Sequence, residues 1–242
     1  MSAEEYLLAV EREGRALRDA ARDLEARVPS CPAWNVHQLV EHVGDMHRSW
    51  AAVARTRASH PSELDRDSLR YSPEKGNLLD WYEGGLAEIL DVLRTTSEDA
   101  TFWTFWPPQQ NIAFLRRRMA HETAVHRWDC EAAHGEPRPL EPRLAADGVD
   151  ELLRVYLPAW GKARGSGETV GLRATDTGDD WLLTIRDGEL ATTDALGTAG
   201  VTIAGPAKDV LLALWGRIPL DALAIDGDPE PLTRLLHEAD FD

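Results

Sequence analysis

The segment RRRMAHETAVHRWD, residues 116–129, carries the strongest structural signal in this chain. It lies within a run of apolar residues at helical spacing, which predicts one long amphipathic helix. At about 100° per residue, Glu122 and His126 fall on the apolar stripe, at positions where leucine is expected. His121 falls on the opposite side, where we expect it to face solvent. Because an unpaired buried carboxylate is costly, Glu122 must be paired or bound to something.

The spacing of four residues between Glu122 and His126 brings both side chains to one point, as in helix-borne metal sites. A preceding segment predicts another helix, and His42 sits at the edge of its apolar face. Ligands in helical bundles commonly project inward from facing helices, so His42 is a candidate third ligand. Two imidazoles and one carboxylate leave a fourth tetrahedral position open, which is typical of a catalytic zinc site. An internal ion pair is the alternative interpretation of the same spacing.

The first half of the chain contains four amphipathic stretches, which predict an up-and-down four-helix bundle. The first has helical spacing over residues 7–28, and the second begins at Asn35, which forms a capping-box-like start with Gln38. The third covers about residues 75–93 despite two central glycines, and the fourth covers about residues 111–134.

The second half has a different pattern, which predicts a small α+β domain with a short antiparallel sheet. The proline-rich stretch EPRPLEPR, residues 136–143, marks the expected boundary between a domain at 1–140 and a domain at 141–242. An Asp-Gly pair at residues 187–188 predicts a hairpin turn. Short strands are expected at residues 169–175, 181–191 and 201–205, and short helices at residues 206–215 and 229–238. The fold class of the whole chain is therefore predicted as α+β.

The composition excludes several classes of partner. Lys and Arg number 26 against 42 Asp and Glu, and the formal net charge is −16. A surface this acidic repels phosphate backbones and anionic headgroups, so we expect neither nucleic acid nor membrane as a partner. The longest apolar run, residues 210–215, is far shorter than the roughly 20 residues of a membrane span. Cys31 and Cys130 are too few for a disulfide framework, and we expect a cytoplasmic monomer or small homo-oligomer.

Two segments resemble the motifs of a known family. PSCPAWNVHQLVEHVGDMH, residues 29–47, resembles the opening motif of the mycothiol-dependent maleylpyruvate isomerase-like family, and residues 116–129 resemble its second motif. The stretch from residue 201 onward resembles its smaller C-terminal domain, so the resemblance covers nearly the whole chain. The family belongs to the DinB-like metal-binding four-helix bundles. Residues 35–38 depart from the family's usual Thr or Ser, small residue and Asp, which we interpret as variation in helix capping.

The resemblance implies a metal site made by His42, Glu122 and His126, the same residues that helical spacing selects. It implies a divalent metal, zinc for this donor set, and mycothiol as thiol cofactor or cosubstrate. A metal-bound thiol is held as the thiolate, a strong nucleophile toward an electron-poor carbon. Addition to the double bond of maleylpyruvate, rotation and elimination would make the enzyme an isomerase, and addition alone would make it a mycothiol S-transferase.

Both activities stay open at this point, as does a non-catalytic small-molecule or thiol binding protein with a sterol-carrier-like C-terminal domain. The expected partners of the enzyme are a small-molecule electrophile and a low-molecular-weight thiol. Two further residues are candidates for supporting roles. Arg118 either binds a substrate carboxylate or pairs with Glu122. Asp129 either accepts the free ring N–H of His126 or forms a surface salt bridge.

The remaining residues near the motifs have simpler expected roles. His47, like His121, is expected at the surface or behind the ligands, and Cys31 is expected in a turn. Trp34 either packs beside the motif or lines a pocket. The run TFWTFWPP, residues 101–108, either closes one end of the bundle or forms the lip of a pocket.

Overall fold

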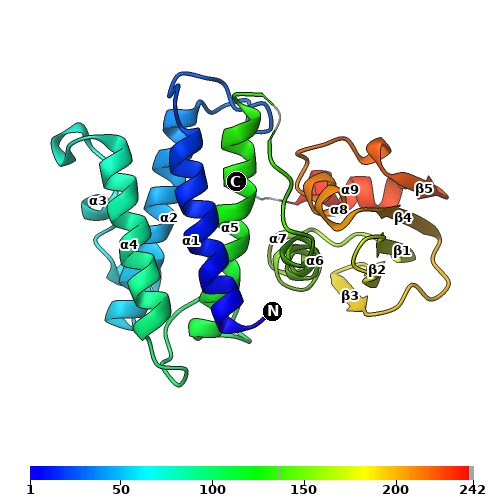
Figure 1. Ribbon diagram of the computed structural model, residues 1–242. Coiled ribbons are helices and arrows are strands. Elements are labelled where there is room, and N and C mark those ends of the chain that lie inside the picture. Colours follow the sequence, from blue (N-terminus) through cyan, green and yellow to red (C-terminus); the bar gives the residue numbers. More distant parts are fainter. Residues whose placement is uncertain (136, 240–242) are drawn as a thin grey trace. The chain divides into compact units, whose positions relative to one another are not determined.

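Long helices build the first of two units into which the chain divides (Figure 1). The computed structural model describes residues 1–135 and 137–239, and its units are Met1–Pro139 and Leu140–Asp242. The long helices of the first unit are α1 (Ala3–Ala20), α2 (Val36–Thr56), α4 (Leu78–Thr95) and α5 (Ile112–Ala132). Between α2 and α4 lie the short segments η1 (Pro61–Glu63), α3 (Arg66–Leu69) and η2 (Pro73–Lys75).

Side-chain caps start the two helices that carry the motif residues. The Asn35 side chain accepts the Gln38 N–H and the Gln38 side chain accepts the Asn35 N–H, each at 3.0 Å, which confirms the predicted capping box. Asn111 caps α5 in the same sense, since its side chain accepts the Phe114 N–H at 3.2 Å.

The first helix is shorter than its apolar pattern predicts. Helical spacing continues to residue 28, but α1 ends at Ala20. The backbone of the following loop pairs with the start of α2 instead: Val36 N–H donates to the Ala26 carbonyl and His37 N–H to the Leu24 carbonyl, both at 2.9 Å. These hydrogen bonds satisfy backbone groups that a continued helix would have used internally.

Helix α5 is buried around most of its circumference. It runs beside α1 (Figure 1), and large apolar residues such as Leu115 and Met119 are fully buried. Helices α2 and α4 approach closely at Gly44, where an added Cβ would lie 2.2 Å from the Trp81 ring. This close contact leaves no room for a side chain at Gly44.

The second unit places helices beside a five-stranded sheet with the order β3-β2-β1-β4-β5. Its strands are β1 (Ser166–Ala174), β2 (Asp180–Arg186), β3 (Glu189–Thr193), β4 (Val201–Gly205) and β5 (Ala224–Asp226). Its helical segments are α6 (Pro142–Glu151), the π-helical η3 (Leu152–Tyr156), α7 (Leu157–Trp160), α8 (Ala207–Leu214), η4 (Leu220–Ala222) and α9 (Glu230–Glu238).

The sheet is mixed, which corrects the prediction of an antiparallel sheet. The β2–β3 hairpin forms as predicted, with Arg186 opposite Glu189 and Gly188 at a φ of 75°. After β3, however, the chain crosses to the free edge of β1, and β4 pairs with β1 in parallel. Strand β5, which the sequence pattern did not predict, then pairs with β4.

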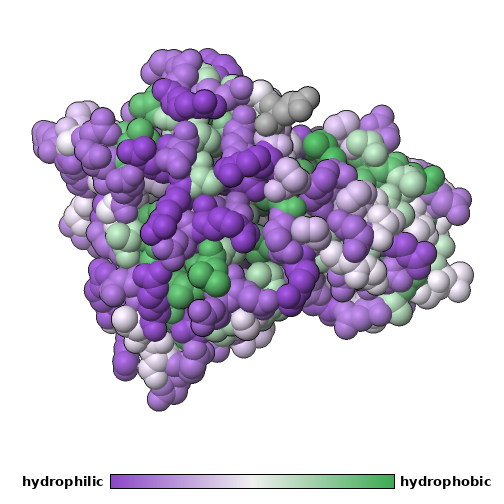
Figure 2. All heavy atoms as spheres, in the orientation of Figure 1, coloured by the Kyte–Doolittle hydropathy of each residue, from purple (hydrophilic) through white to green (hydrophobic). Residues whose placement is uncertain are grey.

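Polar side chains cover most of the face of the first unit that Figure 2 shows, in keeping with the net charge of −16. No helix among residues 1–135 and 137–239 combines the length and apolar character that crossing a bilayer requires.

Candidate metal centre

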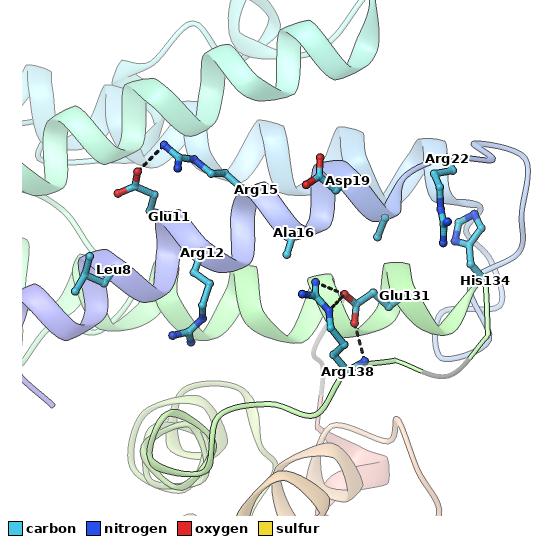
Figure 3. A pocket seen from close by; sticks show the side chains of 11 residues that line it. Leu8, Glu11, Arg12, Arg15, Ala16, Asp19, Arg22, Glu131, His134 and Arg138 are labelled. Atoms are coloured by element: carbon cyan, nitrogen blue, oxygen red, sulfur yellow. Dashed lines mark hydrogen bonds and ion pairs between the residues drawn. The ribbon is translucent and has the colours of Figure 1, made fainter.

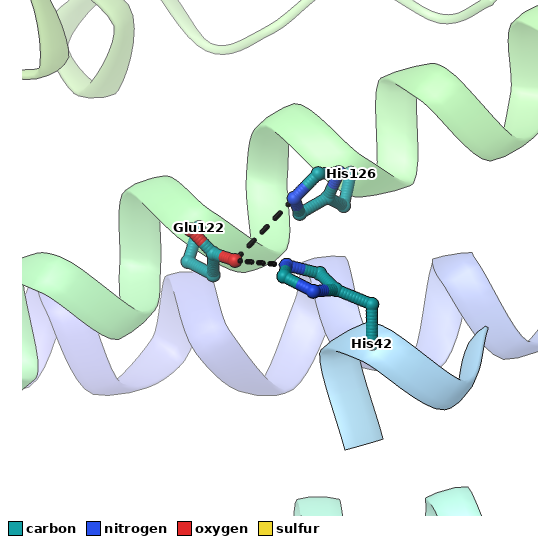
Figure 4. Close-up of side chains that lie close together, drawn as sticks. All are labelled: His42, Glu122 and His126. Carbon is teal, nitrogen blue, oxygen red and sulfur yellow. Dashed lines mark hydrogen bonds and ion pairs between the residues drawn. The ribbon is translucent and has the colours of Figure 1, made fainter. Parts of the chain in front are cut away.

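His42, Glu122 and His126 converge on one point between two helices (Figure 4). His42 projects from the second turn of α2, and the other two project from successive turns of α5. Glu122 Oε1 lies 3.0 Å from His42 Nε2 and 3.3 Å from His126 Nε2. All three candidate ligand atoms lie within 4.8 Å of one another.

This geometry fits a divalent metal ion. Zinc ligands lie about 2.0–2.1 Å from the ion, so neighbouring ligand atoms in a tetrahedral site are about 3.4 Å apart. The measured separations of 3.0 and 3.3 Å are close to that value. Two imidazole nitrogens and one carboxylate oxygen are also ligands that zinc commonly takes in catalytic sites.

The electrostatics of the cluster favour a cation. Burial alone would raise the pKa of Glu122, but the positive charge of His126 and hydrogen bonds from both imidazoles outweigh it, so this pKa lies well below its usual value. Burial would lower the pKa of His126, but Glu122 and Asp129 raise it to about 9. The cluster therefore holds a proton tightly at the place where a metal ion would bind.

The three side chains differ in access to solvent. His42 is 33% exposed, whereas Glu122 and His126 are 12% and 9% exposed. His42 is therefore the most accessible of the three side chains.

Arg118 is buried beside Glu122 and pairs with it. Its Nη2 donates to Glu122 Oε2 at 3.0 Å, and its side chain is only 3% exposed. Of the two roles considered for Arg118, the structure shows the pairing. Arg118 engages the second carboxylate oxygen, so Oε1 is the oxygen that faces both imidazoles.

Asp129 and Ser30 form a hydrogen-bonded chain behind His126. Asp129 Oδ2 lies 3.0 Å from His126 Nδ1, and Asp129 Oδ1 accepts the Ser30 hydroxyl at 2.6 Å. The Asp129 side chain is fully buried, which excludes the surface salt bridge considered for it. Sequence reasoning missed Ser30, because nothing in its turn indicates a contact 99 residues away.

Trp34 packs against both histidines from the turn that precedes α2. Its ring centroid lies 4.8 Å from that of His42 and 6.2 Å from that of His126. Cys31 supplies the backbone carbonyl that accepts the Trp34 N–H at 2.8 Å, in keeping with its expected place in a turn. The half-buried Trp34 thus forms one wall of the cluster.

Two further histidines are buried, and for His121 this differs from the prediction, whereas His47 lies behind the ligands, one of the two places expected for it. His121, expected to face solvent, is only 2% exposed and packs edge-on against Tyr6, because α5 is enclosed on this side as well. His47 is fully buried, and its Nε2 lies 2.9 Å from Thr123 Oγ1. Burial lowers the pKa of His47 to about 4, so this ring is neutral.

The aromatic loop at residues 101–108 packs onto the bundle. Trp103 stacks on Trp50 at 5.5 Å with nearly parallel rings, and Phe105 contacts Phe114 edge-on. These contacts support the interpretation that the loop closes part of the bundle.

A separate groove of about 880 Å³ runs along α1 and the end of α5, away from the candidate ligands (Figure 3). Four arginines line it, but Arg15 pairs with Glu11 and Arg138 with Glu131 (Figure 3). The groove therefore presents mixed charge and adds nothing to the candidate metal centre.

Comparison with known proteins matches both units. The family model described as the mycothiol maleylpyruvate isomerase N-terminal domain matches residues 7–131, and the model of the corresponding C-terminal domain matches residues 143–234. No curated protein sequence matches the chain.

Two solved structures share the fold of the whole chain. They are the mycothiol-dependent maleylpyruvate isomerase and a histidine-to-alanine mutant of that enzyme. Each has 14% sequence identity and a TM-score of 0.63, with 93% of both chains covered.

Proposed function

This chain belongs to the mycothiol maleylpyruvate isomerase family, and from that premise we propose that it is a metal- and mycothiol-dependent enzyme. The proposed reaction is addition of the thiol to an electron-poor carbon of a small molecule. An isomerase would follow addition with elimination, and an S-transferase would release the adduct. A thiol cosubstrate is in keeping with the cytoplasm, where thiols are kept reduced.

The convergence of His42, Glu122 and His126 is the observation that carries this proposal. A protein that only bound an apolar ligand would gain nothing from three ionisable side chains in the bundle, because their desolvation is costly. A metal ion held by all three side chains would compensate for that cost. Zinc is the ion that we propose for these donors.

The residues around the cluster set the protonation state and orientation of the candidate ligands. Arg118 keeps Glu122 ionised and oriented, and Asp129 accepts a hydrogen bond from His126. A divalent ion bound by these ligands would lower the pKa of a coordinated thiol and so supply a thiolate at neutral pH. The exposed side of His42 gives the thiol and the electrophile a path to the site.

Metal analysis followed by thiol-dependent turnover tests the proposal. Protein loaded with zinc and freed of excess metal should contain one ion per chain by elemental analysis. It should then convert maleylpyruvate to its trans isomer, or form an S-conjugate with an alkylating electrophile, only when mycothiol is present. A chain without bound zinc would contradict the proposal. Zinc binding without either reaction would favour the non-catalytic binding protein.

A further inference from the structure

Ser30 and His126 are connected through a single buried carboxylate. The Ser30 hydroxyl donates to Asp129 Oδ1 at 2.6 Å, and Asp129 Oδ2 lies 3.0 Å from His126 Nδ1. Ser30 belongs to the loop between α1 and α2, whereas the other two residues lie on α5. The contact therefore joins the loop to the candidate metal centre.

The contact with the Asp129 carboxylate decides which ring nitrogen of His126 has a lone pair available for a metal ion. An ionised carboxylate only accepts hydrogen bonds, so His126 Nδ1 must carry the proton in this contact. The lone pair of the neutral ring is then on Nε2, the nitrogen that faces Glu122 Oε1 at 3.3 Å. A ring with the opposite tautomer would present an N–H to the metal and could not bind it.

Ser30 keeps Asp129 in place for this task. A buried carboxylate needs hydrogen-bond donors, and the Ser30 hydroxyl supplies one to the oxygen that His126 does not use. The turn that holds Ser30 is itself fixed, because Cys31 N–H donates to the Val28 carbonyl at 3.1 Å and Val28 N–H donates to the Trp34 carbonyl at 3.2 Å.

We propose that Ser30 is a positioning residue of the metal centre, which acts through Asp129 to hold His126 in the orientation and tautomer that bind the ion. The inference rests on the proposed metal centre, and it assigns a role to a residue outside the ligand set. Because Ser30 acts through Asp129, the two side chains should affect metal affinity as one unit.

A set of four variants tests this role by zinc affinity, measured in competition with a chromophoric chelator. Ser30→Ala should weaken zinc binding by about tenfold and Asp129→Asn by up to about a hundredfold, the range seen when residues behind metal ligands are removed. The double variant should be no weaker than Asp129→Asn alone. Ser30→Thr keeps the hydroxyl and should restore wild-type affinity.

Two further measurements separate positioning from general loss of structure. The visible spectrum of the cobalt-substituted protein should shift in Ser30→Ala and return in Ser30→Thr, since it reports ligand geometry. Ser97→Ala is the control, because Ser97 also donates to an aspartate, Asp99, but lies in the turn after α4. It should leave both affinity and spectrum unchanged.

The outcomes distinguish this inference from the proposed function. If the wild-type chain binds zinc and Ser30→Ala binds it equally well, the role of Ser30 is wrong and the metal centre stands. Additive effects of Ser30→Ala and Asp129→Asn would overturn the route through Asp129. A wild type that binds zinc but shows no turnover would overturn the proposed enzymatic function. If its variants still had the predicted zinc affinities, the positioning role of Ser30 would be supported. A wild type that binds no zinc overturns both.

Discussion

The two oxygens of Glu122 have different partners: Oε2 accepts from Arg118, and Oε1 faces both imidazoles. Glu122→Gln keeps the shape and removes the charge. We expect the variant to lose zinc affinity and at least about a hundredfold in thiol-dependent turnover. Elemental analysis and an activity assay on one sample would measure both.

The matched control for this variant is Glu131→Gln. Glu131 also pairs with a buried arginine of α5, Arg127, but it lies outside the ligand cluster. Removing one partner of a buried ion pair costs about 3–5 kcal/mol, so both variants should melt at lower temperature. Only Glu122→Gln should lose zinc. Wild-type turnover in Glu122→Gln would show that Glu122 is not a ligand.

Two histidines give the metal-free protein opposite pH dependences. The pKa of His126 is raised from 6.5 to about 9, so its contribution to stability is full below pH 6.5 and is lost as the pH rises to 9. The pKa of His47 is lowered to about 4, so its contribution is full above pH 6.5 and is lost as the pH falls to 4. The free energy of unfolding should change by about 1.4 kcal/mol per pH unit in each range: the alkaline limb, from pH 6.5 to 9, and the acid limb, from pH 6.5 to 4.

Urea unfolding at a series of pH values would measure the free energy of unfolding of the wild type and of variants that lack one histidine. The difference in stability between wild type and His47→Gln should shrink toward acid pH, and that between wild type and His126→Gln should shrink toward alkaline pH. Zinc should abolish the alkaline limb, because bound metal replaces the proton on His126. An alkaline limb that persists in the zinc-loaded protein would contradict this account.

At the scale of the elements, the close contact of α2 and α4 sets a limit on side-chain size. A Cβ at Gly44 would lie 2.2 Å from the Trp81 ring, which is itself buried. Gly44→Ala should therefore destabilise the protein by about 1–3 kcal/mol, as overpacked cores do. Because His42 is on the same helix, zinc affinity should fall as well.

Gly84→Ala, on α4 in the same helix pair, is the natural comparison. The nearest atom to its added Cβ would be the end of the Arg48 side chain, which can move. Alanine is also favoured over glycine within a helix by about 1 kcal/mol. Equal destabilisation by both substitutions would show that the contact between Gly44 and Trp81 does not limit side-chain size more than the surroundings of Gly84 do.

The elements also show what periodicity can predict. Capping residues located the start of α2, helical spacing located α5, and spacing selected His42, Glu122 and His126, which the structure brings together. Periodicity misplaced the end of α1, because the loop finds its hydrogen-bond partners at the start of α2. It also predicted wrongly that His121 is exposed. A helical wheel assumes one buried side, whereas α5 is buried on more than one side. Ser30 and β5 depend on contacts distant in sequence, which no local pattern contains.

At the scale of the whole molecule, every candidate ligand and its supporting residues lie within Met1–Pro139. This unit has its own buried core, so a fragment of residues 1–139 should fold and bind one zinc ion per chain. The family models match both units, and turnover should therefore be lost in the fragment. Elemental analysis and an activity assay at equal concentrations would test this, and full turnover in the fragment would show that the second unit is not needed.

The position of Trp34 has a spectroscopic consequence. An indole whose ring centre lies 4.8 Å from one candidate ligand and 6.2 Å from another is close enough for its excited state to sense an ion bound between them. Cobalt or nickel, with partly filled d shells, should quench its emission on binding, whereas zinc, with a filled shell, should leave most of it. The difference in quenching between wild type and Trp34→Phe would isolate this indole from the other eight of the chain's nine tryptophans. With a metal ion bound at the proposed centre, Trp34 would serve as a built-in fluorescent indicator of metal occupancy.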